Sequence, residues 1–154
     1  MPYLIDGHNL IPKLGLRLDS PDDEMELVAI LQEFCRLERR QAEVYFDGAP
    51  QASTRRLGAV TAHFVPLTTT ADNAIRNRVK KMGKSAKNWT VVSSDRQVQA
   101  ESRAAQADIM SSDSFAMLLR QARDTAPKST EDRKLSRQEV DEWLKVFEQR
   151  KHKP

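Results

Sequence analysis

Four aspartates occupy positions in the sequence where their carboxylates could bind a cation together. Asp6, Asp47 and Asp95 each follow a short apolar run, and Asp72 lies in the first turn of a helix expected after a further run. Oxygen-only ligands suit Mg²⁺ or Mn²⁺ rather than zinc. Such ions activate water and stabilise the leaving oxygen in phosphoryl displacement, so this spacing indicates metal-dependent phosphoryl chemistry.

The elements that must position these aspartates alternate along the chain. Apolar runs predict strands at 3–5, 44–46, 59–65 and 89–92, with a short edge strand at 108–110. Helical periodicity predicts helices over 21–40, 70–82 and 95–104 and across 115–122. This alternation predicts an α/β fold with a parallel sheet, whose ligands bind beyond the carboxyl ends of the strands. All four aspartates are therefore expected at one edge.

Each aspartate also has a purely structural interpretation. Aspartate after a strand commonly forms a turn or caps a helix N-terminus. The joint position of all four, next to a basic stretch, supports the metal-site interpretation as well as the structural one, and both stay open at this point.

Length and composition indicate one domain without a membrane span. The 154 residues are 39% hydrophobic and 31% charged, with one cysteine and no apolar run of 18 residues. No secretory signal is visible, so we expect a reducing, cytoplasmic location. The domain is expected to span 1–150, with a polar linker or loop at about 124–135, a helix opened by the capping box at 136–139, and a basic tail at 151–154.

Basic residues gather in the second part of the chain. The first 50 residues carry ten acidic and five basic side chains, whereas the remainder carries twelve acidic and twenty basic ones. A basic stretch of this kind binds polyanions or forms a solvated helix face. The candidate polyanion-binding residues are Arg76, Lys80, Lys81, Lys84, Lys87 and Arg96.

Other catalytic motifs are missing from the sequence. It has no phosphate-binding glycine loop, no dinucleotide fingerprint and no serine-nucleophile elbow. The three histidines lack metal-ligand spacing. His8 is close enough to the expected site to orient a phosphate, and His63 is expected to be an ordinary strand side chain.

Four short motifs together resemble the NYN-domain family of PIN-like ribonucleases, in its bacterial YacP-like branch. They are Tyr-Leu-Ile-Asp-Gly-His-Asn-Leu-Ile at 3–11, Val-Tyr-Phe-Asp-Gly at 44–48, Thr-Ala-Asp-Asn-Ala-Ile at 70–75 and Val-Val-Ser-Ser-Asp-Arg-Gln at 91–97. The resemblance covers nearly the whole chain. It implies a PIN-like three-layer α/β/α sandwich and Mg²⁺- or Mn²⁺-dependent cleavage of RNA that leaves a 5′-phosphate and a 3′-hydroxyl.

The resemblance also implies roles for individual residues. Asp6, Asp72 and Asp95 match the metal ligands, and Asp47 matches an acidic residue that lines the site. Asn9 would orient Asp6 or a ligand, and Ser94 would bond Asp95 or a water molecule. The YacP-like branch further suggests single-stranded mRNA and the ribosome as partners.

One departure from the family pattern leaves a second function open. Where the branch often has two adjacent acids, this chain has Asp72 followed by Asn73. An uncharged amide weakens cation binding, so the alternative is a non-catalytic RNA- or ribosome-binding module. A third hypothesis, a phosphate-receiver domain of flavodoxin-like type, is disfavoured because the strand at 59–65 does not end in aspartate.

Overall fold

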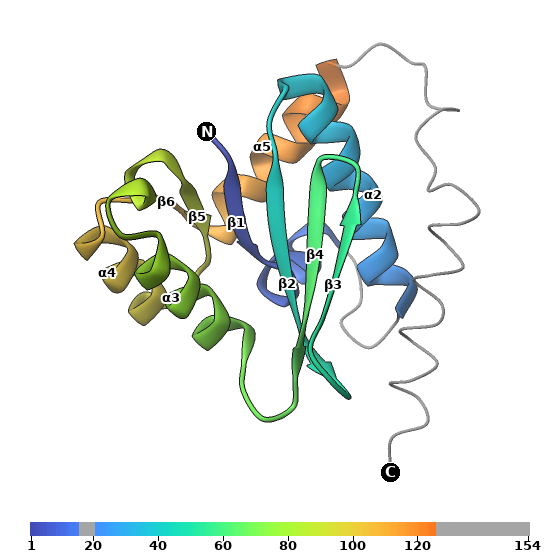
Figure 1. Cartoon of the computed structure of the whole chain (residues 1–154). Coiled ribbons are helices and arrows are strands. Elements are labelled where there is room, and N and C mark those ends of the chain that lie inside the picture. The colour runs from blue at the N-terminus through green and yellow to red at the C-terminus, as the bar shows by residue number, and fades with distance from the viewer. Residues whose placement is uncertain (16–20, 126–154) are drawn as a thin grey trace.

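A six-stranded sheet forms the centre of the structure, a computed structural model that describes residues 1–15 and 21–125 (Figure 1). Its strands are β1 (Tyr3–Asp6), β2 (Ala42–Ala49), β3 (Ser53–Leu57), β4 (Val60–Pro66), β5 (Thr90–Val92) and β6 (Asp108–Met110). Their spatial order is β3-β4-β2-β1-β5-β6. All neighbouring pairs are parallel except β3 with β4, so the predicted mainly parallel sheet is confirmed.

Helices cover both faces of this sheet and make three layers. The helical elements are α1 (Gly7–Leu10), η1 (Ile11–Leu14), α2 (Pro21–Glu38), α3 (Ala71–Met82), η2 (Gly83–Asn88), α4 (Arg96–Ala104) and α5 (Ser112–Thr125), where η marks a 3-10 helix. Helices α2 and α5 lie on one face, and α3 and α4 on the other (Figure 1). The predicted three-layer α/β/α sandwich is therefore confirmed. No helix within the described ranges is long and apolar enough to cross a membrane.

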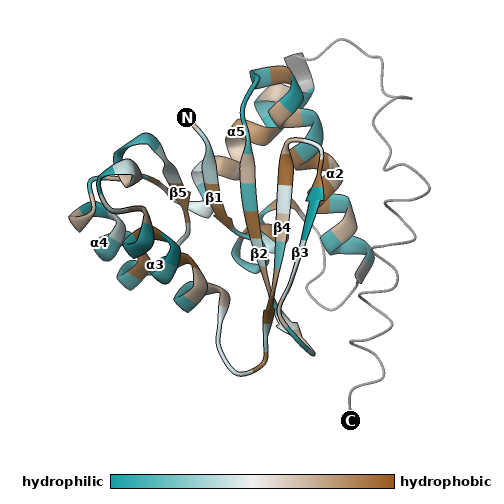
Figure 2. Cartoon of the chain, viewed as in Figure 1, coloured by the Kyte–Doolittle hydropathy of each residue, from teal (hydrophilic) through white to brown (hydrophobic). Residues whose placement is uncertain are grey.

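Alternation along the central strands supplies the core on each side. Tyr3 and Ile5 pack in the cluster under α2 and α5, whereas Leu4 between them packs under α3 and α4. Figure 2 shows the same division, with apolar residues along the strands and hydrophilic residues on the outer surfaces of α3 and α4. A strand that is buried on both faces has a continuous apolar sequence, which is why β1 is recognisable from its sequence.

The strand order reverses direction at β1. From β1 the chain builds β2 and β4 on one side of it, and then β5 and β6 on the other. The crevice at such a reversal, beyond the strand ends, is where open α/β sheets bind ligands. A flavodoxin-like receiver has another order, with its second strand at one edge, so the receiver hypothesis is wrong.

Several elements differ from the sequence-based expectation. The residues after Asp6 form α1 and η1 rather than a simple turn, and β3 is an additional strand. Strand β3 pairs with β4 through a two-residue loop whose first residue, Gly58, has φ of +67°. Helix α5 continues to Thr125, so the predicted linker at 124–135 starts within a helix. The rest of that linker, the helix expected from 136 and the tail at 151–154 lie outside the described residues.

Gly7 allows α1 to approach β2 closely. A Cβ atom at this position would lie 2.4 Å from Cε1 of Phe46 and 2.9 Å from the carbonyl oxygen of Tyr45. Phe46 is fully buried, so its ring has no space to withdraw. The short helix that follows Asp6 therefore requires glycine here.

We predict that Gly7→Ala lowers the free energy of unfolding by about 1–3 kcal/mol, because overpacking forces α1 away from β2. Urea denaturation measures the change. Shortening the facing ring in the double variant Gly7→Ala/Phe46→Leu is expected to recover part of the loss. Strictly additive effects of the two substitutions would contradict the proposed contact.

Candidate active site

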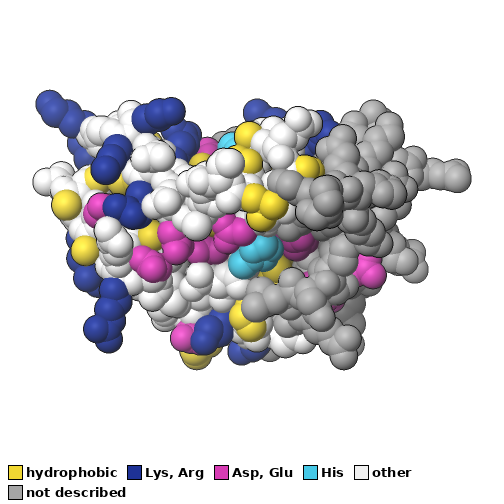
Figure 3. Space-filling model, turned by 90° about the horizontal axis from the view of Figure 1, so that it is seen from below, with side chains coloured by type: hydrophobic (Ala, Val, Ile, Leu, Met, Phe, Trp, Pro, Cys, Tyr) yellow, Lys and Arg dark blue, Asp and Glu magenta, His cyan; other side chains and the backbone are white. Residues whose placement is uncertain are grey.

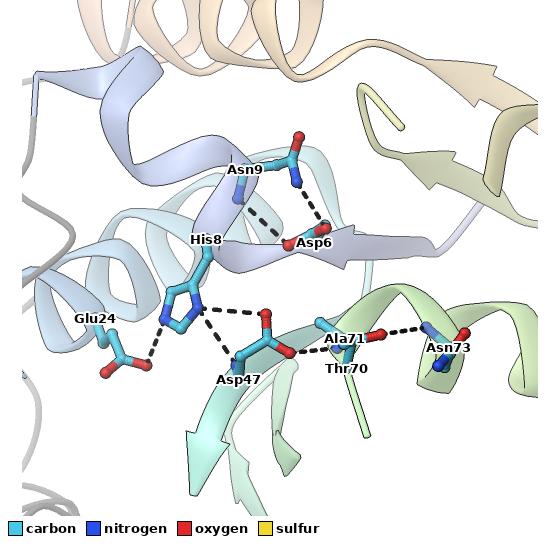
Figure 4. Close-up of polar contacts among 8 residues, drawn as sticks. All are labelled: Asp6, His8, Asn9, Glu24, Asp47, Thr70, Ala71 and Asn73. Atoms are coloured by element: carbon cyan, nitrogen blue, oxygen red, sulfur yellow. Dashed lines mark hydrogen bonds and ion pairs between the residues drawn. The ribbon is translucent and has the colours of Figure 1, made fainter. Parts of the chain in front are cut away.

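Asp6 ends β1 at the point where the strand order reverses. Its side chain caps α1 and accepts two hydrogen bonds from Asn9, one from the backbone N–H at 3.3 Å and one from Nδ2 at 2.8 Å (Figure 4). Asp6 is only 2% exposed. The structural and functional interpretations of this residue thus coincide, because the capping bonds also fix the direction of its carboxylate.

A second carboxylate, Asp72, meets Asp6 from the start of α3. Burial, followed by the hydrogen-bonding contact with Asp72 and the charges of Asp72 and Asp47, raises the pKa of Asp6 to about 7. Burial and the neighbouring negative charges therefore both disfavour the ionised form of Asp6. The Oδ1 atom of Asp72 is buried and has no hydrogen-bond partner among the described residues. A divalent cation would satisfy this oxygen and remove the repulsion.

Asp47 joins β2 to the beginning of α3. Its Oδ1 accepts a hydrogen bond from the backbone N–H of Ala71 (Figure 4). Thr70 caps the same helix, with its Oγ1 accepting from the backbone N–H of Asn73 at 3.1 Å, as its position in the sequence predicts. The N-terminus of α3 therefore directs its partial positive charge toward the carboxylates.

His8 links this cluster to α2. Its Nε2 lies 3.2 Å from Oε2 of Glu24, and its Nδ1 lies 3.7 Å from Oδ2 of Asp47 (Figure 4). Burial acts to lower the pKa of His8, but hydrogen bonds to Asp47 and Glu24 and their charges raise it to about 9. Its Nδ1 also accepts a hydrogen bond from the backbone N–H of Asp47 at 3.4 Å, so His8 connects β2 with α2. Glu24 was not predicted, because no sequence pattern connects it with a residue sixteen positions earlier.

Asp95 lies at the same edge, at the start of α4. Its side chain caps the helix by accepting from the backbone N–H of Val98 at 2.9 Å, and its own backbone N–H donates to Ser93 Oγ at 3.1 Å. The Oγ of Ser94 accepts instead from the backbone N–H of Ser112, at 3.2 Å. The serine that positions Asp95 is therefore Ser93, whereas Ser94 joins the end of β5 to α5.

The described residues, 1–15 and 21–125, contain no group of three or more Asp, Glu, His or Cys side chains arranged to hold a metal ion. Asp6, Asp72 and Asp95 thus do not form a ready three-ligand set. The donors that do meet are Asp6 and Asp72. Mg²⁺ commonly takes one or two protein carboxylates and completes its shell with water and substrate phosphate. The hard oxygen atoms and the unsatisfied Oδ1 fit such an ion.

Asn73 is turned away from the carboxylate pair. It is exposed, and its Oδ1 accepts a hydrogen bond from Nη1 of Arg76 at 3.1 Å. Arg76 also forms a two-point ion pair with Glu101 of α4. The hydrogen bond to Glu101, followed by the charges of Glu101, Asp95 and Asp72, raises the pKa of Arg76. This guanidinium therefore lies within the field of both aspartates.

The lysines lie farther from the carboxylates than Arg76. Lys80, Lys84 and Lys87 line an open groove of about 540 Å³ between the end of α3 and the end of α4. Since a helix rises 1.5 Å per residue, Lys80 lies about 12 Å along α3 from Asp72. Figure 3 shows the molecule from below the view of Figure 1. Acidic side chains and a histidine lie in the middle of this surface, and Lys and Arg side chains lie toward its rim.

Comparison with solved structures defines the class of this domain. Two crystal structures of Rae1 (YacP) from Bacillus subtilis share its fold, and their likeness at these identities concerns the fold alone. The first has a TM-score of 0.65 and 20% sequence identity, and the alignment covers 96% of this chain and 92% of the Rae1 chain. The second, of the W164L mutant, has a TM-score of 0.63 and 19% identity, and the alignment covers 97% of this chain and 96% of the mutant chain.

The family follows from the sequence profile. The YacP-like NYN domain matches residues 3–153, so the chain belongs to this family of PIN-like nucleases. Nucleases of this kind generally depend on a divalent metal and act on RNA. No curated protein sequence matches the chain.

We predict that Asp6→Asn stabilises the metal-free protein in a pH-dependent way. A carboxyl group whose pKa rises to about 7 on folding contributes stability below its unfolded pKa of about 3.9, and that contribution is lost as pH rises through 7. In EDTA, the stability difference between variant and wild type should therefore grow from pH 4 to 7, by up to about 4 kcal/mol, and then level off.

Urea denaturation at a series of pH values measures this difference, and Asp108→Asn, an exposed position at the start of β6, is the matched control. A difference that does not change with pH would show that Asp6 is not under electrostatic strain.

Proposed function

We propose that this protein is a metal-dependent endoribonuclease that hydrolyses phosphodiester bonds of single-stranded RNA. The observation that supports it most strongly is the buried contact of Asp6 with Asp72, whose Oδ1 is unsatisfied. Burial and mutual repulsion of two carboxylates both lower the stability of the folded protein. Such a pair at a strand-order reversal therefore points to a ligand-binding role. Membership of a PIN-like nuclease family agrees with this function.

In this proposal Asp6 and Asp72 hold Mg²⁺ or Mn²⁺ and Asp95 completes the acidic edge. The bound cation supplies activation of water and stabilisation of the leaving oxygen. Asn9 keeps the Asp6 carboxylate in position through two hydrogen bonds. Asp47 fixes the start of α3, and with it Asp72, by accepting from Ala71. The expected products carry a 5′-phosphate and a 3′-hydroxyl.

The substrate proposed is mRNA in the cytoplasm, with the ribosome as the site of action. The exposed Lys80, Lys81, Lys84 and Lys87, together with Arg96, would contact phosphates of the RNA chain. Such contacts position the nucleic acid without reading its sequence. Arg76 contributes to this surface by a structural role, because its ion pair with Glu101 holds α3 against α4.

A second candidate function is an RNA- or ribosome-binding module that does not cleave. Two observations favour it: Asn73 replaces the second acid and is bonded to Arg76, and no three-ligand set is assembled in the described ranges. This alternative predicts RNA binding that is sensitive to salt but survives both EDTA and Asp6→Asn.

Cleavage of end-labelled single-stranded RNA in Mn²⁺ separates the two functions. We expect wild type to cut, EDTA to abolish cutting, and Asp6→Asn to cut at least about 100-fold more slowly, because a metal ligand is removed. Asp108→Asn should retain the wild-type rate. Binding without cleavage, with and without added ribosomes, would contradict the nuclease proposal and favour the binding module.

Neutralising the three groove lysines tests the proposed RNA path. In Lys80→Gln/Lys84→Gln/Lys87→Gln we expect weaker RNA binding and a salt dependence of log K reduced by about 0.7 for each phosphate that is no longer neutralised. Arg36→Gln, on the exposed surface of α2, is the control and should change neither value. Filter binding across a series of KCl concentrations gives both quantities. An unchanged salt slope would place the RNA elsewhere.

A further inference from the structure

A second hollow lies on the other side of α3 from the lysine groove. Its volume is about 530 Å³, within the range of ordinary ligand pockets. Residues from β2, β3, β4 and the first turns of α3 line it, among them Tyr45, Thr54, His63, Thr69 and Asn77. On this face of the sheet α3 packs beside β2, and Figure 1 shows no described helix over β3.

The imidazole of His63 is held in a fixed orientation at the floor of this hollow. It stacks on Tyr45 with ring centroids 4.6 Å apart and planes inclined by 18°. Its Nε2 lies 3.0 Å from Oε1 of Glu43, and its Nδ1 lies 3.1 Å from Oγ1 of Thr54. One ring face and both nitrogens are engaged, and the side chain, which lines the hollow, is 25% exposed.

The partners of Glu43 make this arrangement rigid. Its carboxylate also accepts hydrogen bonds from the hydroxyl of Tyr45 at 3.2 Å and from Nη2 of Arg78 at 3.1 Å. Burial acts to raise the pKa of Glu43, but the hydrogen bonds and charges of His63 and Arg78 lower it to about 2. An ionised Glu43 only accepts, so Nε2 of His63 donates in this hydrogen bond.

This hollow lies beside the candidate active site. The sheet register places Asp6 of β1 next to Tyr45 of β2, and Tyr45 next to His63 of β4. Asp47 is bonded to the backbone N–H of Ala71, and Thr69, two residues before Ala71, lines the hollow. A polynucleotide whose phosphate lies at Asp6 and Asp72 therefore has a neighbouring nucleotide within reach of His63.

We propose that this hollow is a subsite for a nucleobase of the RNA substrate next to the scissile phosphate, with the base stacked on the free face of His63. The inference rests on the proposed ribonuclease function and adds a residue that contacts the substrate. Stacking on an aromatic side chain tolerates every base. Since both nitrogens of His63 are already bonded, this platform contributes affinity and position rather than sequence readout.

An abasic scan of a short RNA tests the subsite. A 5′-fluorescent RNA of about twelve nucleotides, a length within the usual site sizes for single strands, is made as a series in which each member lacks one base. Its binding is measured by anisotropy in EDTA. In wild type we expect removal of one particular base, beside the cleavage site, to weaken binding about tenfold. In His63→Ala the intact RNA should bind about tenfold more weakly, and removal of that base should then cost less than about twofold.

Two variants separate stacking from disruption of the structure. His63→Phe keeps an aromatic face without ring nitrogens and should retain wild-type affinity within about threefold. Thr61→Ala, two residues earlier on β4 and outside the hollow, should behave as wild type. Should His63→Ala fail to fold, photocrosslinking of 5-iodouridine RNA to the wild-type chain replaces it, with crosslinks expected at His63 or Tyr45.

Each outcome decides the proposal independently of catalysis. Identical abasic profiles in wild type and folded His63→Ala, or crosslinks confined to other surfaces, would overturn the subsite. Cleavage of the same RNA in Mn²⁺ is followed in parallel. Cleavage without a base effect at His63 refutes the subsite and leaves the nuclease function intact, whereas a base effect without cleavage supports the subsite and contradicts the nuclease function.

Discussion

The contact of two buried carboxylates beyond the end of β1 is the constraint on which this site depends. Asp6 is almost completely buried, and its pKa rises to about 7 because of burial, Asp72 and Asp47. Such a pair destabilises the folded chain above neutral pH unless a proton or a cation accompanies it. The rest of the fold must therefore keep the pair together against its own repulsion, which explains the dense bonding around it.

Separate connections from the surrounding elements provide this restraint. Asn9 holds Asp6 through two hydrogen bonds, and the short helix that carries Asn9 packs on β2 where Gly7 leaves room for Phe46. Asp47 secures α3, and α3 brings Asp72. His8 connects Asp47 with Glu24 of α2. Segments far apart in the sequence thus meet at one sheet edge, where polar bonds hold them together.

Much of this arrangement could be predicted from the sequence, because buried parallel strands and capped helices leave local patterns. The apolar runs before Asp6 and Asp95 and the cap at Thr70 located these residues correctly. The exposed strand β3 was missed because Ser-Thr-Arg-Arg-Leu carries little apolar signal, although Leu-Gly-Ala-Val at 57–60 is a hairpin pattern. The partners Glu24 of His8 and Glu43 of His63 depend on tertiary packing, which no local spacing encodes.

Direct measurement of Mn²⁺ binding tests the central claim that Asp6 and Asp72 form a cation site. The electron paramagnetic resonance signal of free Mn²⁺ is followed during titration of wild type, Asp72→Asn and Asp108→Asn at about pH 6 and about pH 8, on either side of the raised pKa. We predict binding by wild type and Asp108→Asn that is tighter at the higher pH, since the cation competes with a proton for Asp6, and binding by Asp72→Asn that is at least about tenfold weaker. Equal affinity of wild type and Asp72→Asn at both pH values would contradict the account.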